Sequence, residues 1–154
     1  MKTVKDAAKR TISLNYNRAM EGVGLWEKES HIATGLFIGM IPHSMFYEKI
    51  GMVEIDPVKA LMSFVTEVNP SRPLALVVSV VEEDELKGEG FIGAEMVQPK
   101  TWNENNIDHH LMVMRDFTAN AGIADAIETV KKMHEYIKEG KAVFVHCKAG
   151  RARS

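Results

Sequence analysis

Residues 141–154 read Lys141-Ala142-Val143-Phe144-Val145-His146-Cys147-Lys148-Ala149-Gly150-Arg151-Ala152-Arg153-Ser154, and this stretch decides the class of fold. Its first part, up to His146, is apolar and partly β-branched, which is typical of a strand buried on both faces of a sheet. Its second part begins with the only cysteine of the chain and ends on an arginine and a serine. The sequence therefore predicts a buried strand whose end presents a short loop.

The residue types in this loop indicate covalent phosphoryl transfer through Cys147. A free thiol has a pKa of about 8.5, so a cysteine nucleophile must be helped to ionise near neutral pH. If residues 148–152 curl, their backbone N–H groups form an anion-binding nest around thiolate and phosphate, and Gly150 supplies the freedom for that curl. Arg153 can offer its planar fork to two phosphate oxygens. Ser154 can donate a hydrogen bond to the sulfur, which holds the thiolate and helps it leave.

The residues of the curl itself are expected to surround the bound phosphate. They are Lys148, Ala149, Gly150, Arg151 and Ala152.

Length, charge and composition exclude several classes of function. A chain of 154 residues fits one domain with a real core. Its 19 basic and 21 acidic residues give a net charge of -2, so we expect no nucleic-acid partner. One cysteine allows no internal disulfide, which is consistent with an intracellular, reducing compartment. No apolar run reaches the length of about 18 residues that a membrane-spanning helix needs.

Residues 1–30 form a basic segment ahead of the catalytic domain expected at residues 31–154. Apolar positions are interspersed among its charges, which suits a surface helix packed on the domain, an organelle-targeting segment or a peripheral membrane contact. Mitochondrial, membrane-peripheral and cytoplasmic locations are the alternatives that follow. The charged residues among the first 20 are Lys2, Lys5, Lys9, Arg10 and Arg18, with Asp6 as the only acid.

Hydrophobic periodicity predicts strands that alternate with helices. The expected elements are a strand at 33–39 with a turn at Pro42, a helix from Asp56-Pro57 to Val68, a strand at 74–81, mainly loop at 82–106, a strand at 109–114, a helix from Ile123 closed by Gly140, and a strand at 141–146. This order predicts an α/β fold with a mostly parallel central sheet flanked by helices. A helix should follow the phosphate loop and reinforce anion binding. Helices following the loop are absent from this chain, so we expect the catalytic domain to be incomplete at its C-terminal end.

A carboxylic acid is also needed to protonate the leaving oxygen of a phosphate ester. Asp116 follows the strand predicted at 109–114, where loops converge on the site of a parallel sheet. The alternative for this residue is a helix N-cap or a turn.

Two other patterns in the sequence resemble cofactor or metal sites. Gly88 to Gly93 matches the glycine spacing of dinucleotide-binding loops, but it lacks the strand–turn–helix context that such loops need. His109 and His110 are adjacent, so on a strand they point to opposite faces and cannot readily hold one metal ion. We expect no metal and no cofactor.

The stretch from His146 to Ser154 resembles the signature of the cysteine-dependent protein tyrosine and dual-specificity phosphatase superfamily. Together with Asp116-Phe117-Thr118, it is similar to the mitochondrial-type phosphatidylglycerophosphate phosphatase group within that superfamily. The acidic residues 82–85 and the strand–turn at Gly39–Pro42 add to this resemblance. It implies a metal-independent enzyme with a phosphocysteine intermediate.

By this resemblance Cys147 is the nucleophile, Arg153 the phosphate clamp and Asp116 the general acid and base. Lys148 and Arg151 add two cations to the loop, which favours an anionic phospholipid such as phosphatidylglycerophosphate. Two alternatives remain. One is a protein tyrosine or dual-specificity phosphatase that acts on phosphoprotein, and the other is a non-catalytic phosphate-binding module. The expected partner is thus a phosphorylated lipid or protein.

Overall fold

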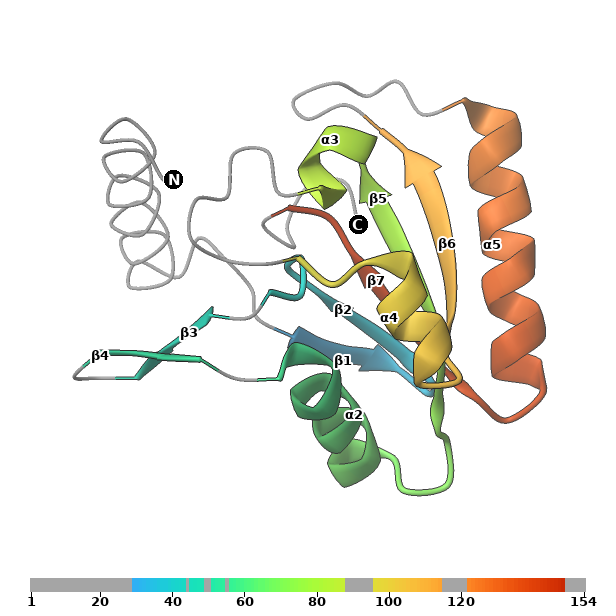
Figure 1. The fold of residues 1–154 in the computed structure, drawn as a ribbon. Helices are drawn as coiled ribbons and strands as arrows, with labels where there is room; N and C mark the ends of the chain where they lie inside the picture. Colours follow the sequence, from blue (N-terminus) through green and yellow to red (C-terminus); the bar gives the residue numbers. More distant parts are fainter. Residues whose placement is uncertain are drawn as a thin grey trace.

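The computed structural model describes residues 29–43, 45–48, 51–54, 56–87, 96–114 and 122–148. Within these ranges a sheet is flanked by helices on both faces (Figure 1). The elements are β1 (Glu29–Ala33), β2 (Leu36–Gly39), β3 (Met45–Glu48), β4 (Gly51–Glu54), α2 (Pro57–Val68), β5 (Leu74–Val81), α3 (Glu83–Leu86), α4 (Pro99–Glu104), β6 (Asp108–Val113), α5 (Ile123–Lys138) and β7 (Ala142–His146).

The main sheet has five strands in the order β1-β2-β7-β5-β6. Strand β7 pairs in parallel with both β2 and β5, and β5 pairs in parallel with β6. Only β1 runs antiparallel, beside β2. The predicted α/β fold with a mostly parallel sheet is therefore confirmed.

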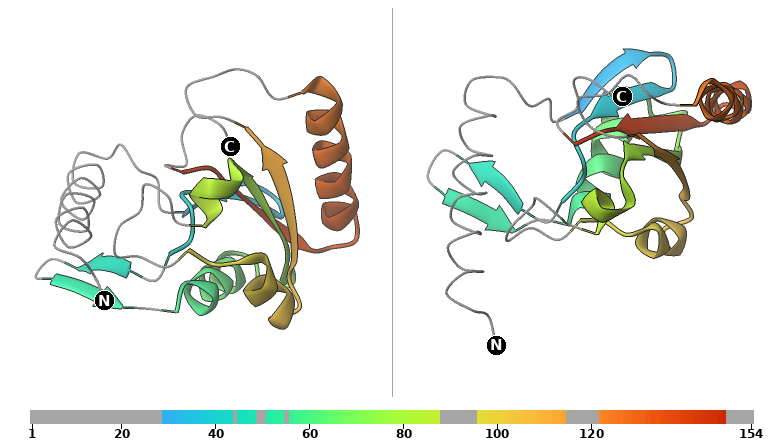
Figure 2. Two further views of the ribbon diagram at one scale, coloured as in Figure 1. Left: turned by 45° about the horizontal axis from the view of Figure 1, so that its top comes forward. Right: turned by 90° about the horizontal axis from the view of Figure 1, so that it is seen from above.

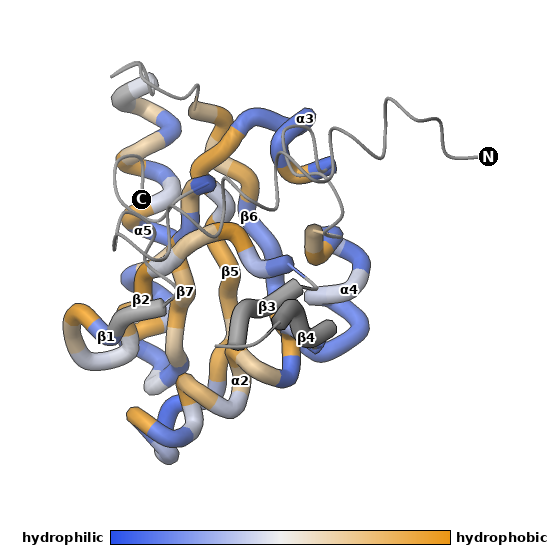
Figure 3. The backbone as a smooth tube through the Cα atoms, turned by 90° about the vertical axis from the view of Figure 1, so that its left-hand side faces the viewer, coloured by the Kyte–Doolittle hydropathy of each residue, from blue (hydrophilic) through white to orange (hydrophobic). Residues whose placement is uncertain are grey.

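The two central strands form because their residues are apolar on both faces. Every residue of β7 is buried, and in β5 only Ala75 is partly exposed. Apolar residues run along both strands in Figure 3. Helices α2 and α4 cover one face through a cluster that includes Trp102 and Phe144, whereas α5 covers the other through Met133 and Ile137. The two further views in Figure 2 show the helices on either side of the sheet.

Helices α2 and α5 begin and end much as the sequence predicts. The carboxylate of Asp56 accepts hydrogen bonds from the backbone N–H groups of Val58 and Lys59 at 3.0 and 3.2 Å, and Pro57 occupies the first helical position. Gly140 follows α5 with a φ of +80°, the left-handed conformation that glycine adopts at little cost.

The predicted loop at residues 82–106 is wrong in part, because two short helices lie within it. The Glu82 backbone N–H donates to the Glu85 carboxylate at 2.9 Å, and this capping arrangement starts α3. Pro99 begins α4, whose Trp102 side chain is fully buried. Both helices are too short for periodicity to reveal them.

The predicted strand at 33–39 is likewise a hairpin of β1 and β2 rather than one strand. The turn between them contains Gly35, with a φ of +76°. An added Cβ there would approach Arg72 Nη1 and the Lys141 carbonyl oxygen to 2.9 Å each, so this close contact needs glycine. The small antiparallel sheet of β3 and β4 was not predicted.

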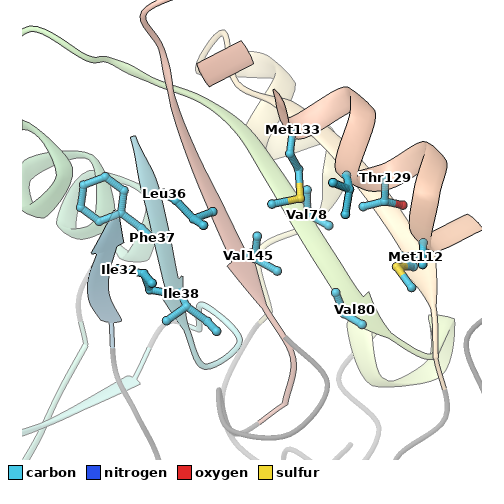
Figure 4. A pocket seen from close by; sticks show the side chains of 12 residues that line it. Ile32, Leu36, Phe37, Ile38, Val78, Val80, Met112, Thr129, Met133 and Val145 are labelled. Atoms are coloured by element: carbon cyan, nitrogen blue, oxygen red, sulfur yellow. The ribbon is translucent and has the colours of Figure 1, made fainter. Parts of the chain in front are cut away.

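An apolar groove of about 320 Å³ lies on the face of the sheet beside α5 (Figure 4). Leu36, Ile38 and Val145 line it from β2 and β7. On α5, Ile127 and Val130 are 51% and 61% exposed. In the described part of the chain, α5 therefore leaves some of this face open, and the expectation of helices beyond the loop stays a prediction.

Candidate active site

The carboxyl ends of the parallel strands meet at one edge of the sheet, where ligands bind in folds of this kind. Cys147 follows β7 at this edge, and Ile41 lies shortly after β2. Helix α3 begins directly after β5. Figure 1 shows α3 beside the ends of β5 and β6. The sheet thus places the cysteine at its centre, between neighbours on both sides.

The backbone that leads into the predicted loop is held by two hydrogen bonds. Nδ1 of His146 lies 3.0 Å from the Cys147 carbonyl oxygen. The Ile41 backbone N–H donates to the Lys148 carbonyl oxygen at 3.2 Å. Because a peptide unit is planar, fixing a carbonyl oxygen also fixes the direction of the N–H group across the same bond. The peptide unit that joins Cys147 to Lys148 therefore has a defined orientation.

A row of polar side chains, in which Ser79 and His146 are buried and His109 is partly buried, connects this backbone to strand β6. Ser79 Oγ lies 2.6 Å from His146 Nε2 and 2.7 Å from His109 Nε2. Ser79 is fully buried, and His146 and Cys147 are 1% and 2% exposed. The row runs from β6 through β5 to β7 and ends on the carbonyl group of Cys147.

The partners in this row define where the protons lie when both imidazole rings are neutral. A carbonyl oxygen only accepts, so Nδ1 of His146 carries its proton and Nε2 is an acceptor. Ser79 then donates its hydroxyl proton to His146, and its oxygen accepts the Nε2 proton of His109. Burial lowers the pKa of His109 to about 4, with smaller contributions from His110 and Lys132. His109 is therefore neutral at physiological pH.

The adjacent His110 points to the opposite face, as predicted. Its Nε2 donates to the Thr129 hydroxyl at 2.9 Å, and that hydroxyl donates to the Asp125 carbonyl oxygen at 2.7 Å. Burial lowers the pKa of His110 from its usual value, because it disfavours the charged form of the ring. Among the described residues no three His, Cys, Asp or Glu side chains are grouped to hold a metal ion.

The structure places two of the predicted site residues, Cys147 and Lys148, at this edge. Strand β6 ends at Val113, shortly before Asp116 in the chain. The other predicted residues lie outside the described ranges: Asp116, Ala149, Gly150, Arg151, Ala152, Arg153 and Ser154.

Sequence reasoning did not select Ser79 or His109. The available signal was the single hydroxyl in the otherwise apolar run Leu74–Val81. A buried hydroxyl needs hydrogen-bond partners, so a serine at that position indicates polar neighbours on adjacent strands.

The solved structures that are similar to this chain include phosphatases. PTPMT1 in complex with PI(5)P matches with a TM-score of 0.58 and 19% identity over 82% of this chain and 66% of the other. A mutant form of Tk-PTP matches with a TM-score of 0.54 and 21% identity over 82% and 64%. Kinase associated phosphatase matches with a TM-score of 0.53 and 13% identity over 77% and 58%. The chain therefore spans less than two thirds of the length of each of these structures.

The chain has the fold of the cysteine-dependent protein tyrosine and dual-specificity phosphatases, as its loop sequence predicts. That fold is also the fold of PTPMT1 and Tk-PTP, which this chain resembles at 19 to 21% identity. Neither a family model nor a curated protein matches the sequence.

Proposed function

We propose that this protein is a cysteine-dependent phosphatase that hydrolyses phosphate monoesters through a phosphocysteine intermediate. One observation carries the proposal: the only cysteine of the chain stands directly after the central parallel strand, at the edge where such sheets bind ligands. The shared fold and the spacing from Cys147 to Arg153 support it.

The proposed reaction has two steps. The Cys147 thiolate attacks phosphorus, an S–P bond forms, and the P–O bond to the alcohol breaks while Asp116 gives that oxygen its proton. Water, deprotonated by the same carboxylate, then attacks the phosphocysteine and releases inorganic phosphate and the thiolate. Arg153 binds two phosphate oxygens through both steps. Ser154 stabilises the sulfur as it leaves.

Asp116→Asn is expected to lower kcat by roughly 10² to 10⁴-fold for alkyl phosphates, because their leaving oxygen needs a proton. The loss should be much smaller for an activated aryl phosphate, whose leaving group is a weak base. Steady-state release of inorganic phosphate from both substrates measures the difference. Asp56→Asn is the matched control, since asparagine caps α2 about as well as aspartate. Equal losses on the two substrates would remove Asp116 from the role of acid.

For the substrate, we infer an anionic phospholipid such as phosphatidylglycerophosphate. Lys148 and Arg151 add cations to the loop, and PTPMT1 with PI(5)P is among the similar structures. Helix α3 bears exposed Glu83 and Asp84 at the same edge of the sheet. These acids disfavour a headgroup that carries many phosphates.

We expect vesicles that contain phosphatidylglycerophosphate to be hydrolysed with a kcat/KM at least about tenfold above that for phosphotyrosine peptides, because Lys148 and Arg151 can bind the second phosphate group. Phosphate release from both substrates at one ionic strength is the measurement. Faster hydrolysis of the peptides would support the second candidate, a protein phosphatase, which the similarity to kinase associated phosphatase also suggests. Binding of phosphate without turnover of either would support a non-catalytic module.

We propose a peripheral contact with the membrane that contains the lipid substrate. None of the described helices has the length and apolar character that crossing a bilayer requires. We propose that the basic residues of segment 1–30 contribute electrostatic attraction to anionic lipid.

A further inference from the structure

We propose that Ser79 and His109 are positioning residues for the phosphate-binding loop, because they hold the His146 ring that fixes the first peptide after the nucleophile. This inference rests on the proposed role of Cys147. It adds two residues, on β5 and β6, that touch neither the substrate nor the sulfur in the proposed reaction.

The register of the sheet brings the three side chains into one row. Ser79 is the Cα partner of His146 across the β5–β7 pairing, and Val77 on the same face of β5 is the partner of His109 across the β5–β6 pairing. The distances of 2.7, 2.6 and 3.0 Å along the row are all those of good hydrogen bonds. The row therefore runs unbroken across three strands to the Cys147 carbonyl oxygen.

Each side chain in the row determines whether the next one donates or accepts a hydrogen bond. The Ser79 hydroxyl has one proton, and His109 Nε2–H occupies its oxygen as a donor, so that proton is directed to His146 Nε2. With Nε2 as an acceptor, neutral His146 keeps its proton on Nδ1 and can donate to Cys147. In the other tautomer Nδ1 and the carbonyl oxygen would both be acceptors and would repel each other.

The orientation of the Cys147 carbonyl group also sets the orientation of the Lys148 N–H group, which belongs to the same peptide unit. The Lys148 N–H points away from that oxygen in the planar unit. It is the first donor of the nest proposed to surround the thiolate and the phosphate. Fixing the carbonyl therefore fixes a dipole that stabilises the ionised sulfur.

Alkylation of Cys147 by iodoacetamide as a function of pH tests this in the full-length protein without requiring turnover. Ser79→Ala is expected to raise the apparent pKa of the thiol by about one unit, so that alkylation at pH near 6 slows roughly tenfold. Ser79→Thr should restore the wild-type profile because it keeps a hydroxyl. His109→Phe should slow alkylation a few-fold, and His109→Gln, which keeps a donor, should slow it less.

His110→Phe is the matched control, since His110 lies next to His109 but binds Thr129 on the other face. The inference is overturned if Ser79→Ala alkylates like this control. If wild-type Cys147 alkylates as an ordinary thiol with a pKa of about 8.5, the proposed function and this inference both fail. An acid-shifted wild-type thiol with an unchanged Ser79→Ala profile overturns the inference alone.

The ¹⁵N chemical shifts of the imidazole nitrogens give a second readout that needs no variant and so does not depend on Ser79→Ala folding. We expect His146 to carry its proton on Nδ1 and His109 on Nε2 at neutral pH. Detection of His146 as the Nε2–H tautomer, or as a cation, would overturn the inference.

Discussion

Replacing Cys147 with serine is expected to abolish turnover of phosphate monoesters, by at least roughly 10⁴-fold, while substrate binding persists. A serine hydroxyl does not ionise near neutral pH and no S–P bond can form. Serine is close to cysteine in size, so the buried position tolerates it sterically. Phosphate release measures turnover, and calorimetry with the unhydrolysed substrate measures binding.

Thermal unfolding of the wild-type and Cys147→Ser proteins is the control for an intact fold. Turnover by a folded Cys147→Ser protein at a rate near that of the wild type would refute the covalent mechanism.

Replacing Arg153 with lysine is expected to lower kcat by roughly 10³-fold, although the positive charge is kept. Lysine cannot offer two parallel N–H groups to the phosphate oxygens as charge develops on them in the transition state. The effect should fall mainly on kcat rather than KM, because that charge is greatest in the transition state. Steady-state kinetics on one soluble phosphate ester separates the two constants.

Arg72→Lys is the matched control for this change. The Arg72 guanidinium donates to the Ile137 and Lys141 carbonyl oxygens at 2.9 and 3.1 Å. Lys141 is the residue that directly precedes β7. We expect Arg72→Lys to lower stability and leave kcat unchanged. If both variants have the same kcat, Arg153 is not the clamp.

Elements with a long, regular pattern could be predicted from the sequence. Strand β5 is apolar apart from Ser79, β7 is apolar up to His146, and α5 carries a helical repeat over its 16 residues. Asp56 and Pro57 mark the start of α2 by local chemistry. In each case the information lies within the segment itself.

Elements that depend on partners distant in sequence were missed. Helix α4 is held by burial of Trp102 in the core, which no local pattern announces. The turn at Gly35 packs closely against Arg72 and Lys141, which lie far along the chain. The hairpin of β3 and β4 is local, but its strands are only four residues each, too short for a periodic pattern to reveal them.

The residues of the candidate site likewise include some that a local pattern identifies and others that depend on the arrangement of the strands. Cys147 could be selected from the sequence because the motif is contiguous. The structure places it directly after the central strand, and its role as the nucleophile stays a prediction. The connection of His146 to Ser79 and His109 depends on the order β7-β5-β6, which the sequence does not state. Arg153 and Asp116 lie outside the described ranges and stay predictions.

The most direct test of the central claim is a search for the phosphocysteine itself. The full-length protein is mixed with a phosphate ester, quenched in acid during turnover, digested and examined by mass spectrometry. We expect a phosphoryl group on the peptide that contains Cys147, and more of it in Asp116→Asn when an activated aryl ester is used, because hydrolysis of the intermediate is then slowed. Turnover with no phosphoryl group on Cys147 in either protein, or with the group on another residue, would contradict a cysteine-dependent mechanism.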